Sequence, residues 1–218
     1  MNVLGNGLYE VQRYEEELSI IEAGLACDMR LGVPEEKILV TKANLAMCYK
    51  SLQRYGEAFR LIRDVYKRSR ALHGAQSPEA LDDAVNLANV LIVTERFGKA
   101  RRFVCKRILE AQLALGSEHE LTLLLRRQFA RTLYMPEDAS RADCWQAEKI
   151  LEGDVEVVRR LFGPDHPHTK IWVSSLNKVR KRIMDRGPPS KRPTFLEIAR
   201  IVLAAREPLE QCRLNKNS

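Results

Sequence analysis

The chain has 218 residues, of which 45% are hydrophobic and 30% are charged, enough for one sizeable folded domain, or an elongated one with an appendage. No apolar run approaches the roughly 18 residues of a membrane-spanning helix, and no basic stretch followed by an apolar block marks a secretory signal. The formal net charge is +7, but residues 1–40 are net acidic and residues 121–218 are net basic. This gradient favours acidic partners towards the C-terminal half.

Short segments recur along the chain at a constant interval. Asn44-Leu45-Ala46 returns 42 residues later as Asn86-Leu87-Ala88, and again as Gln128-Phe129-Ala130. At the same offset, Arg54-Tyr55-Gly56-Glu57-Ala58 returns as Arg96-Phe97-Gly98-Lys99-Ala100. Such self-similarity is typical of a repeat protein, in which each unit buries its apolar face against its neighbours.

Glycines mark the ends of four repeats. They are spaced by 42, 42 and 47 residues, at Gly32, Gly74, Gly116 and Gly163. The longer last interval predicts an insertion of five residues in the fourth repeat, around Tyr134–Asp138. The first repeat fits the same frame one residue short, with Arg13–Glu16 at the position of a turn between two helices.

Each repeat is predicted to form a pair of helices. In the second repeat, residues 41–52 carry an apolar stripe at i, i+4 and i+7, and residues 56–72 follow as the second helix, which Gly74 ends. A further helix over residues 169–186 is expected to cap the stack. No sustained two-residue alternation of apolar and polar residues supports strands.

These features together resemble a known repeat family. A small residue follows each Asn-Leu pair, an aromatic ring lies at the turn of the first three repeats, and alanine comes three residues after it in the second and third, as in Tyr55 and Ala58. Glu17 replaces this alanine in the first repeat, and Cys144 replaces the aromatic residue in the fourth. This pattern, over residues 3–185, resembles the tetratricopeptide repeat, and the ending Leu161–Pro167 is similar to the kinesin light chain version. The resemblance implies an all-α, right-handed α-solenoid of about four repeats of about 42 residues plus a capping helix.

Three regions follow from this organisation. Residues 1–186 are predicted to be the repeat solenoid, and residues 187–193 a Pro-rich linker that cannot be helical. Residues 194–218 are predicted to form a short helix, started by the capping box of Thr194 and Glu197, and a tail. Docking of this helix on the solenoid and binding of a partner both stay open.

The first helix of each pair is expected to line a concave groove, and helical spacing indicates which side chains face it. The groove candidates are Asn44, Met47, Lys50, Asn86, Asn89, Arg127, Arg131, Tyr134 and Lys178. The resemblance implies that Asn44 and Asn86 hold the backbone of an extended peptide, although these amides could instead tie neighbouring helices together. The arginines and Lys178 are cationic donors for carboxylates.

The sequence therefore favours a non-catalytic scaffold or adaptor that binds an extended, acidic peptide. One alternative is a nucleic-acid-binding α-solenoid, suggested by the sequence pI of about 9.3, and another is a regulatory repeat segment of a larger enzyme. Five widely spaced cysteines form no disulfide framework, which indicates the cytoplasm. A nuclear location is the alternative, from the basic clusters Arg180–Arg182 and Lys191–Arg192.

Nothing in the sequence favours catalysis. We expect no metal and no cofactor, because the chain has no Gly-rich phosphate loop and no HExxH or GxSxG motif. The four histidines lie at turns between repeats, with His119 and His166 in matching positions, which indicates a structural role.

Overall fold

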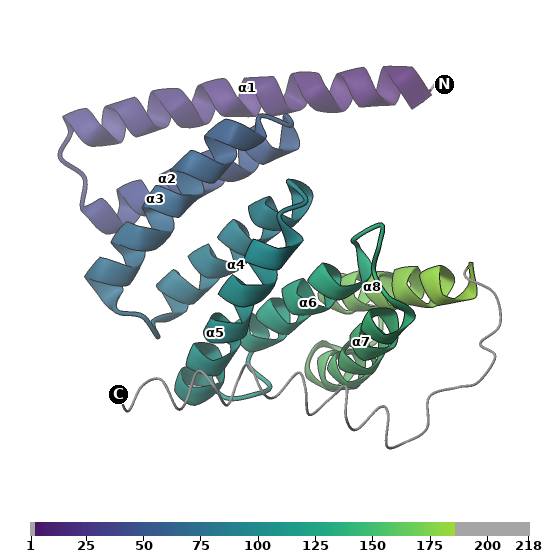
Figure 1. Cartoon of the computed structure of the whole chain (residues 1–218). Helices are drawn as coiled ribbons and strands as arrows, with labels where there is room; N and C mark the ends of the chain where they lie inside the picture. The colour runs from purple at the N-terminus through teal and green to yellow at the C-terminus, as the bar shows by residue number, and fades with distance from the viewer. Residues whose placement is uncertain (1–2, 186–218) are drawn as a thin grey trace. The chain divides into compact units, whose positions relative to one another are not determined.

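The computed structural model describes the backbone of residues 3–185 and the side chains of residues 13–185. This part of the chain forms eight α-helices and no strand (Figure 1). The all-α class predicted from the repeat is confirmed, whereas the predicted linker at 187–193 and helix at 194–218 lie outside the described residues. The helices are α1 (Val3–Arg30), α2 (Glu35–Ser51), α3 (Tyr55–His73), α4 (Pro78–Val93), α5 (Phe97–Leu115), α6 (Glu120–Tyr134), α7 (Arg141–Phe162) and α8 (Pro167–Met184).

The chain divides between Thr94 and Glu95 into two compact units. In the first unit α2 packs against α1, α3 and α4, and α3 also packs against α4. Leu18 of α1 and Leu45 of α2 are buried in one apolar cluster against which Leu61 of α3 packs. Ala46 and Ala58, the predicted small residues of the α2–α3 pair, are fully buried, as close helix packing requires.

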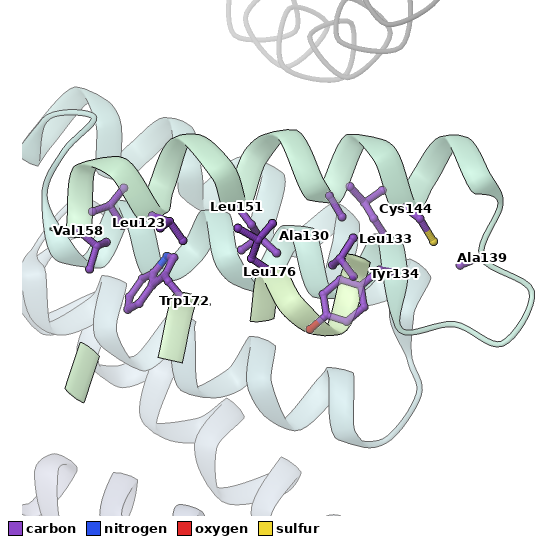
Figure 2. Close-up of a cluster of buried hydrophobic side chains, with 13 residues drawn as sticks. Leu123, Ala130, Leu133, Tyr134, Ala139, Cys144, Leu151, Val158, Trp172 and Leu176 are labelled. Carbon is purple, nitrogen blue, oxygen red and sulfur yellow. The ribbon is translucent and has the colours of Figure 1, made fainter. Parts of the chain in front are cut away.

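In the second unit, α6 packs against α5, α7 and α8, and α7 also packs against α8. Figure 2 shows its core, in which side chains of α6, α7 and α8 meet. Leu123, Leu151 and Trp172 are almost completely buried there. Ala130 and Ala147, which the repeat places at the helix crossing, are also fully buried.

The repeated glycines end helices. Gly74, Gly116 and Gly163 follow the last residues of α3, α5 and α7 with φ of 93°, 92° and 88°. Residues with a Cβ atom rarely adopt such φ values, so glycine is favoured at each of these positions. The glycines therefore recur with the repeat, because each helix pair ends where the chain turns back. Their predicted role as helix stops is confirmed.

A capping residue lies three positions after each of these glycines, also in step with the repeat, and the next helix begins directly after it. Ser77 Oγ accepts from the Ala80 N–H at 3.1 Å. His119 Nδ1 accepts from the Leu121 N–H at 3.2 Å, and His166 Nδ1 accepts from the His168 N–H at 3.2 Å. These bonds satisfy backbone donors left free by the first turn of the helix, so the matching histidines have the structural role predicted for them.

The turn between α6 and α7 is the longest within a helix pair, as the predicted insertion requires. Residues 135–140 separate the two helices, whereas residues 52–54 separate α2 from α3. Ser140 then starts α7 with a capping box, in which Asp143 Oδ2 accepts from the Ser140 N–H at 3.2 Å and Ser140 Oγ accepts from the Asp143 N–H at 3.0 Å.

The first repeat differs from the predicted helix pair. A turn was expected at Arg13–Glu16, but α1 runs unbroken from Val3 to Arg30. The turn after α2 needs Gln53 at φ 59° and is followed by Gly56, whereas Tyr14 is followed by three glutamates, which are good helix formers. Without a glycine or a left-handed residue, the helix continues, and α1 is a single helix in place of a pair.

Candidate functional site

The first unit contains a hollow of about 430 Å³ lined by α2, α4 and the end of α3. Asn44 of α2 and Asn86 of α4, the two asparagines predicted to hold a peptide, both line it. Asn44 is exposed and Asn86 is half-buried. The Asn86 amide donates weakly to Asp82 Oδ2, at 3.5 Å, so it retains capacity for a ligand.

The lining of this hollow is acidic. Glu36, Glu79, Asp82 and Asp83 contribute four carboxylates to it. Its basic lining residues are Lys37 and His73. The acidic peptide expected from the sequence gains no support from this part of the surface.

Asp83 differs from the other three carboxylates because it is 8% exposed. Burial raises its pKa from 3.8 to about 6, against the opposing effects of a hydrogen bond from Ser69 and the proximity of His73. No lysine or arginine among the described residues forms an ion pair with it. The hollow therefore holds a desolvated carboxylate whose charge is opposed, among the described residues, by no lysine or arginine and only by the nearby His73.

The other candidates of the first unit do not line the hollow. Met47 and Lys50 continue the stripe of Asn44 towards the end of α2, and Asn89 continues that of Asn86 along α4. All three side chains are half-buried. The structure thus brings Asn44 and Asn86 together at one place and leaves the remaining three further along their helices.

In the second unit, Arg127, Arg131 and Tyr134 follow one another along α6, and two of them reach Ser175 of α8. Arg127 Nε donates to Ser175 Oγ at 2.9 Å, and the Tyr134 hydroxyl also hydrogen-bonds to Ser175. The Arg127 guanidinium lies 5.7 Å from the centre of the Trp172 ring. Arg131 donates to Gln128 Oε1 at 2.8 Å, within its own helix.

These two arginines are charged groups in a desolvated setting. Burial, and then repulsion from Arg131, lower the pKa of Arg127 to about 10, so it stays charged at neutral pH. Burial also lowers the pKa of Arg131 and raises that of Tyr134. Arg127 has no carboxylate partner among the described residues, so this part of α6 favours an anion.

Lys178 belongs to a basic face of α8. It lines a second hollow, of about 410 Å³, together with Lys170 and Lys181. The other lining residues are Val173, Ser174 and Asn177, so no carboxylate opposes these lysines there. Tyr134, in contrast, is only 6% exposed and cannot offer its ring face to a ligand.

Helical spacing predicts that Asp82 faces the groove, but it did not identify Glu36, Glu79 and Asp83 of the first hollow or the Ser175 partner of Arg127. Over a long stretch of sequence, the acidic run Glu79–Asp83 is offset by basic residues of α3 and α5. Charges counted per helix face could have found it. The contact between Arg127 and Ser175 joins residues 48 apart in the chain and has no local signal.

No helix among the described residues is long and apolar enough to cross a membrane. Between residues 13 and 185, histidines, cysteines and carboxylates nowhere gather in a group of three or more able to hold a metal ion.

Comparison with known proteins identifies the repeat. Residues 38–79 match the family model of the tetratricopeptide repeat, and no curated protein matches the chain in sequence. The fold is similar to that of the nearly identical TPR-like repeats of a Podosopora anserina protein assigned as a kinesin light chain. A variant of that protein matches with 17% identity, 96% of this chain and 93% of that one covered, and a TM-score of 0.60.

A second crystal structure of the Podosopora anserina repeats matches with 16% identity, 95% and 93% coverage of the two chains, and a TM-score of 0.59. BtubC (BKLC) from P. vanneervenii matches with 15% identity, 92% and 75% coverage, and a TM-score of 0.61. At these identities the likeness concerns the fold. The chain therefore contains a tetratricopeptide repeat and has the tetratricopeptide-repeat fold of kinesin light chain-like proteins.

Proposed function

We propose that this chain is a non-catalytic interaction scaffold that binds extended peptide segments, along α2 and α4 in the first unit and along α6 and α8 in the second. Asn44 and Asn86 hold the peptide backbone, because an amide offers both donors and an acceptor whatever the peptide side chains are. Met47, Lys50 and Asn89 extend the contact along α2 and α4. In the second unit Arg127, Arg131 and Lys178 bind carboxylates. The buried Tyr134 shares the hydrogen-bond partner Ser175 with Arg127.

The observation that carries this proposal is the setting of Arg127. A half-buried guanidinium beside a second arginine, with no carboxylate partner among the described residues, is costly unless an anion comes to it. Its Nε is held by Ser175, which leaves the terminal nitrogens for a bidentate contact with a carboxylate. An acidic side chain of a bound peptide supplies such a group.

The compartment that we propose is the cytoplasm. No disulfide joins the described cysteines, Cys27, Cys48, Cys105 and Cys144, and two of them are buried, as is common for proteins of reducing compartments.

A peptide-display screen on the purified chain tests the scaffold. We expect a selected peptide to lose most of its affinity for an Asn44→Ala/Asn86→Ala variant, and its carboxylate-dependent affinity for an Arg127→Met/Arg131→Met variant. The matched control is Arg102→Met/Lys106→Met, which removes the same charge from exposed positions of α5. The proposal is wrong if the screen enriches no peptide, or if all three variants bind like the unchanged protein.

Nucleic acid is the second candidate, because the lysines of α8 gather without an opposing carboxylate. Sequence-tolerant binding of single strands also uses exposed aromatic rings on which bases stack. Tyr134 is too buried for this role. A steep decrease of affinity for an oligonucleotide with rising salt, together with loss of binding in a Lys170→Met/Lys178→Met variant, would favour this candidate.

A further inference from the structure

The hollow of the first unit has the dimensions and the chemistry of a ligand pocket. Its volume of about 430 Å³ lies within the roughly 300–1,000 Å³ of small-ligand sites. Its apolar walls, among them Leu39 and Val40, come from α2, and its carboxylates come mainly from α4. An aliphatic chain that ends in a cation would find both kinds of surface there.

Asp83 is the group within this hollow that most requires a ligand. It is more than nine-tenths buried and lines the hollow, and its side-chain hydrogen bond comes from Ser69. One hydroxyl donor satisfies only one of the acceptor sites of a carboxylate. The Ser69 hydroxyl and the nearby His73 compensate only part of the cost of burying this carboxylate, and burial raises its pKa to about 6.

The carboxylates next to Asp83 would also attract a cationic ligand. Asp82 and Glu79 lie on the same helix, one and four residues before it, and Glu36 faces the hollow from the first turn of α2. Lys37 also lines the hollow, but its side chain is exposed. A cation that enters would therefore meet four carboxylates, against one exposed lysine and the half-buried His73.

We infer that this hollow binds a lysine or arginine side chain of a peptide whose backbone is held by Asn44 and Asn86. The inference rests on the proposed scaffold function and names the chemistry that its first unit recognises. The guanidinium or ammonium group donates to Asp83 and Asp82, and the aliphatic stem lies against Leu39 and Val40. The ligand of the first unit is thus basic, whereas that of the second unit is acidic.

Fluorescence polarisation with three labelled peptides of equal length tests this inference on the full chain. One peptide is a Ser-Arg repeat, the second carries citrulline, the neutral isostere of arginine, and the third is a Ser-Glu repeat. Hydrogen bonds to charged groups are worth about 1.5–3 kcal/mol, so we expect the citrulline peptide to bind about tenfold or more weakly. The Ser-Glu peptide should not bind to the first unit.

Substitutions in the hollow and on the exposed surface distinguish binding in the hollow from attraction by the general surface charge. Asp82→Asn/Asp83→Asn keeps the shape of both side chains, and we expect it to weaken the Ser-Arg peptide about tenfold with little effect on the citrulline peptide. Glu15→Gln/Glu156→Gln removes the same charge from exposed positions and should bind as the unchanged protein does, whereas Lys37→Met should bind more tightly. Far-UV circular dichroism checks that each variant retains its helices.

Two results would overturn the inference: equal affinity for the arginine and citrulline peptides, or an effect of Asp82→Asn/Asp83→Asn no larger than that of the exposed-charge control. If the arginine and citrulline peptides bind equally and Asn44→Ala/Asn86→Ala abolishes both, the scaffold function stands and only the basic ligand is refuted. If neither peptide binds and the display screen enriches nothing, the scaffold function fails as well.

Discussion

Asp154, in the middle of α7, makes the stability of the second unit depend on pH. Its side chain is fully buried, and burial raises its pKa from 3.8 to about 7 against the opposing charge of Arg126. Arg126 approaches Asp154 Oδ1 to 2.7 Å, yet neither carboxylate oxygen has an aligned hydrogen-bond donor among the described residues. The ion pair therefore compensates only part of the desolvation of the carboxylate.

The sign and size of the effect follow from linkage. When the pKa of an acid is higher in the folded than in the unfolded state, the folded state binds more protons, so stability falls as pH rises between the two values. Each pKa unit corresponds to about 1.4 kcal/mol. The pKa of Asp154 rises from 3.8 in the unfolded chain to about 7 in the folded state, so ionisation of Asp154 lowers the free energy of unfolding by on the order of 4 kcal/mol. This loss is complete only at pH values above the folded-state pKa.

The test variant is Asp154→Asn, which keeps the volume of the side chain and removes its ionisable group. Arg126 is 30% exposed, so its guanidinium remains hydrated in the variant. Trp145 and Trp172, the two tryptophans of the chain, lie in α7 and α8. Urea unfolding followed by tryptophan fluorescence therefore reports on the second unit alone.

Between pH 4.5 and pH 8, we expect the unchanged protein to lose about 2–4 kcal/mol of unfolding free energy relative to the variant. Asp165→Asn, at an exposed position, is the control and should keep the pH dependence of the unchanged protein. If Asp154→Asn and the unchanged protein show the same pH dependence, Asp154 is ionised at no cost and the reasoning is refuted.

Three further outcomes can be measured by the same urea titration. Gly116→Ala should cost about 1–3 kcal/mol, because alanine is strained at φ 92° although its Cβ would meet nothing within 4 Å, whereas helical Gly98→Ala should not destabilise. Ala130→Leu should cost about 1–3 kcal/mol by overpacking a fully buried site, and an unchanged unfolding midpoint would contradict the tight helix crossing. His166→Ala should cost about 0.5–2 kcal/mol through loss of the cap on α8, and His166→Asn should restore most of it.

The repeat architecture could be predicted from the sequence because its determinants are local or periodic. A glycine at positive φ, a capping residue three positions later and a small residue at a helix crossing each mark their place in the chain, as at Gly74, Ser77 and Ala88. The failure in the first repeat has the same origin. The motif around Tyr14 was matched, but the glycine that permits a turn was absent, and α1 continued.

The sequence by itself determined the helix pairs of the second, third and fourth repeats and the glycines that end them, but not the unbroken α1 or the start of α2 at Glu35. Only the tertiary structure decided that Asn44 and Asn86 share one hollow, that Asp83 is buried in it, and that Arg127 is held by Ser175 of another helix. The physical reason is that helical periodicity is a property of neighbouring residues. Desolvation of a charge instead depends on which distant helix covers it, and no local pattern encodes that distance.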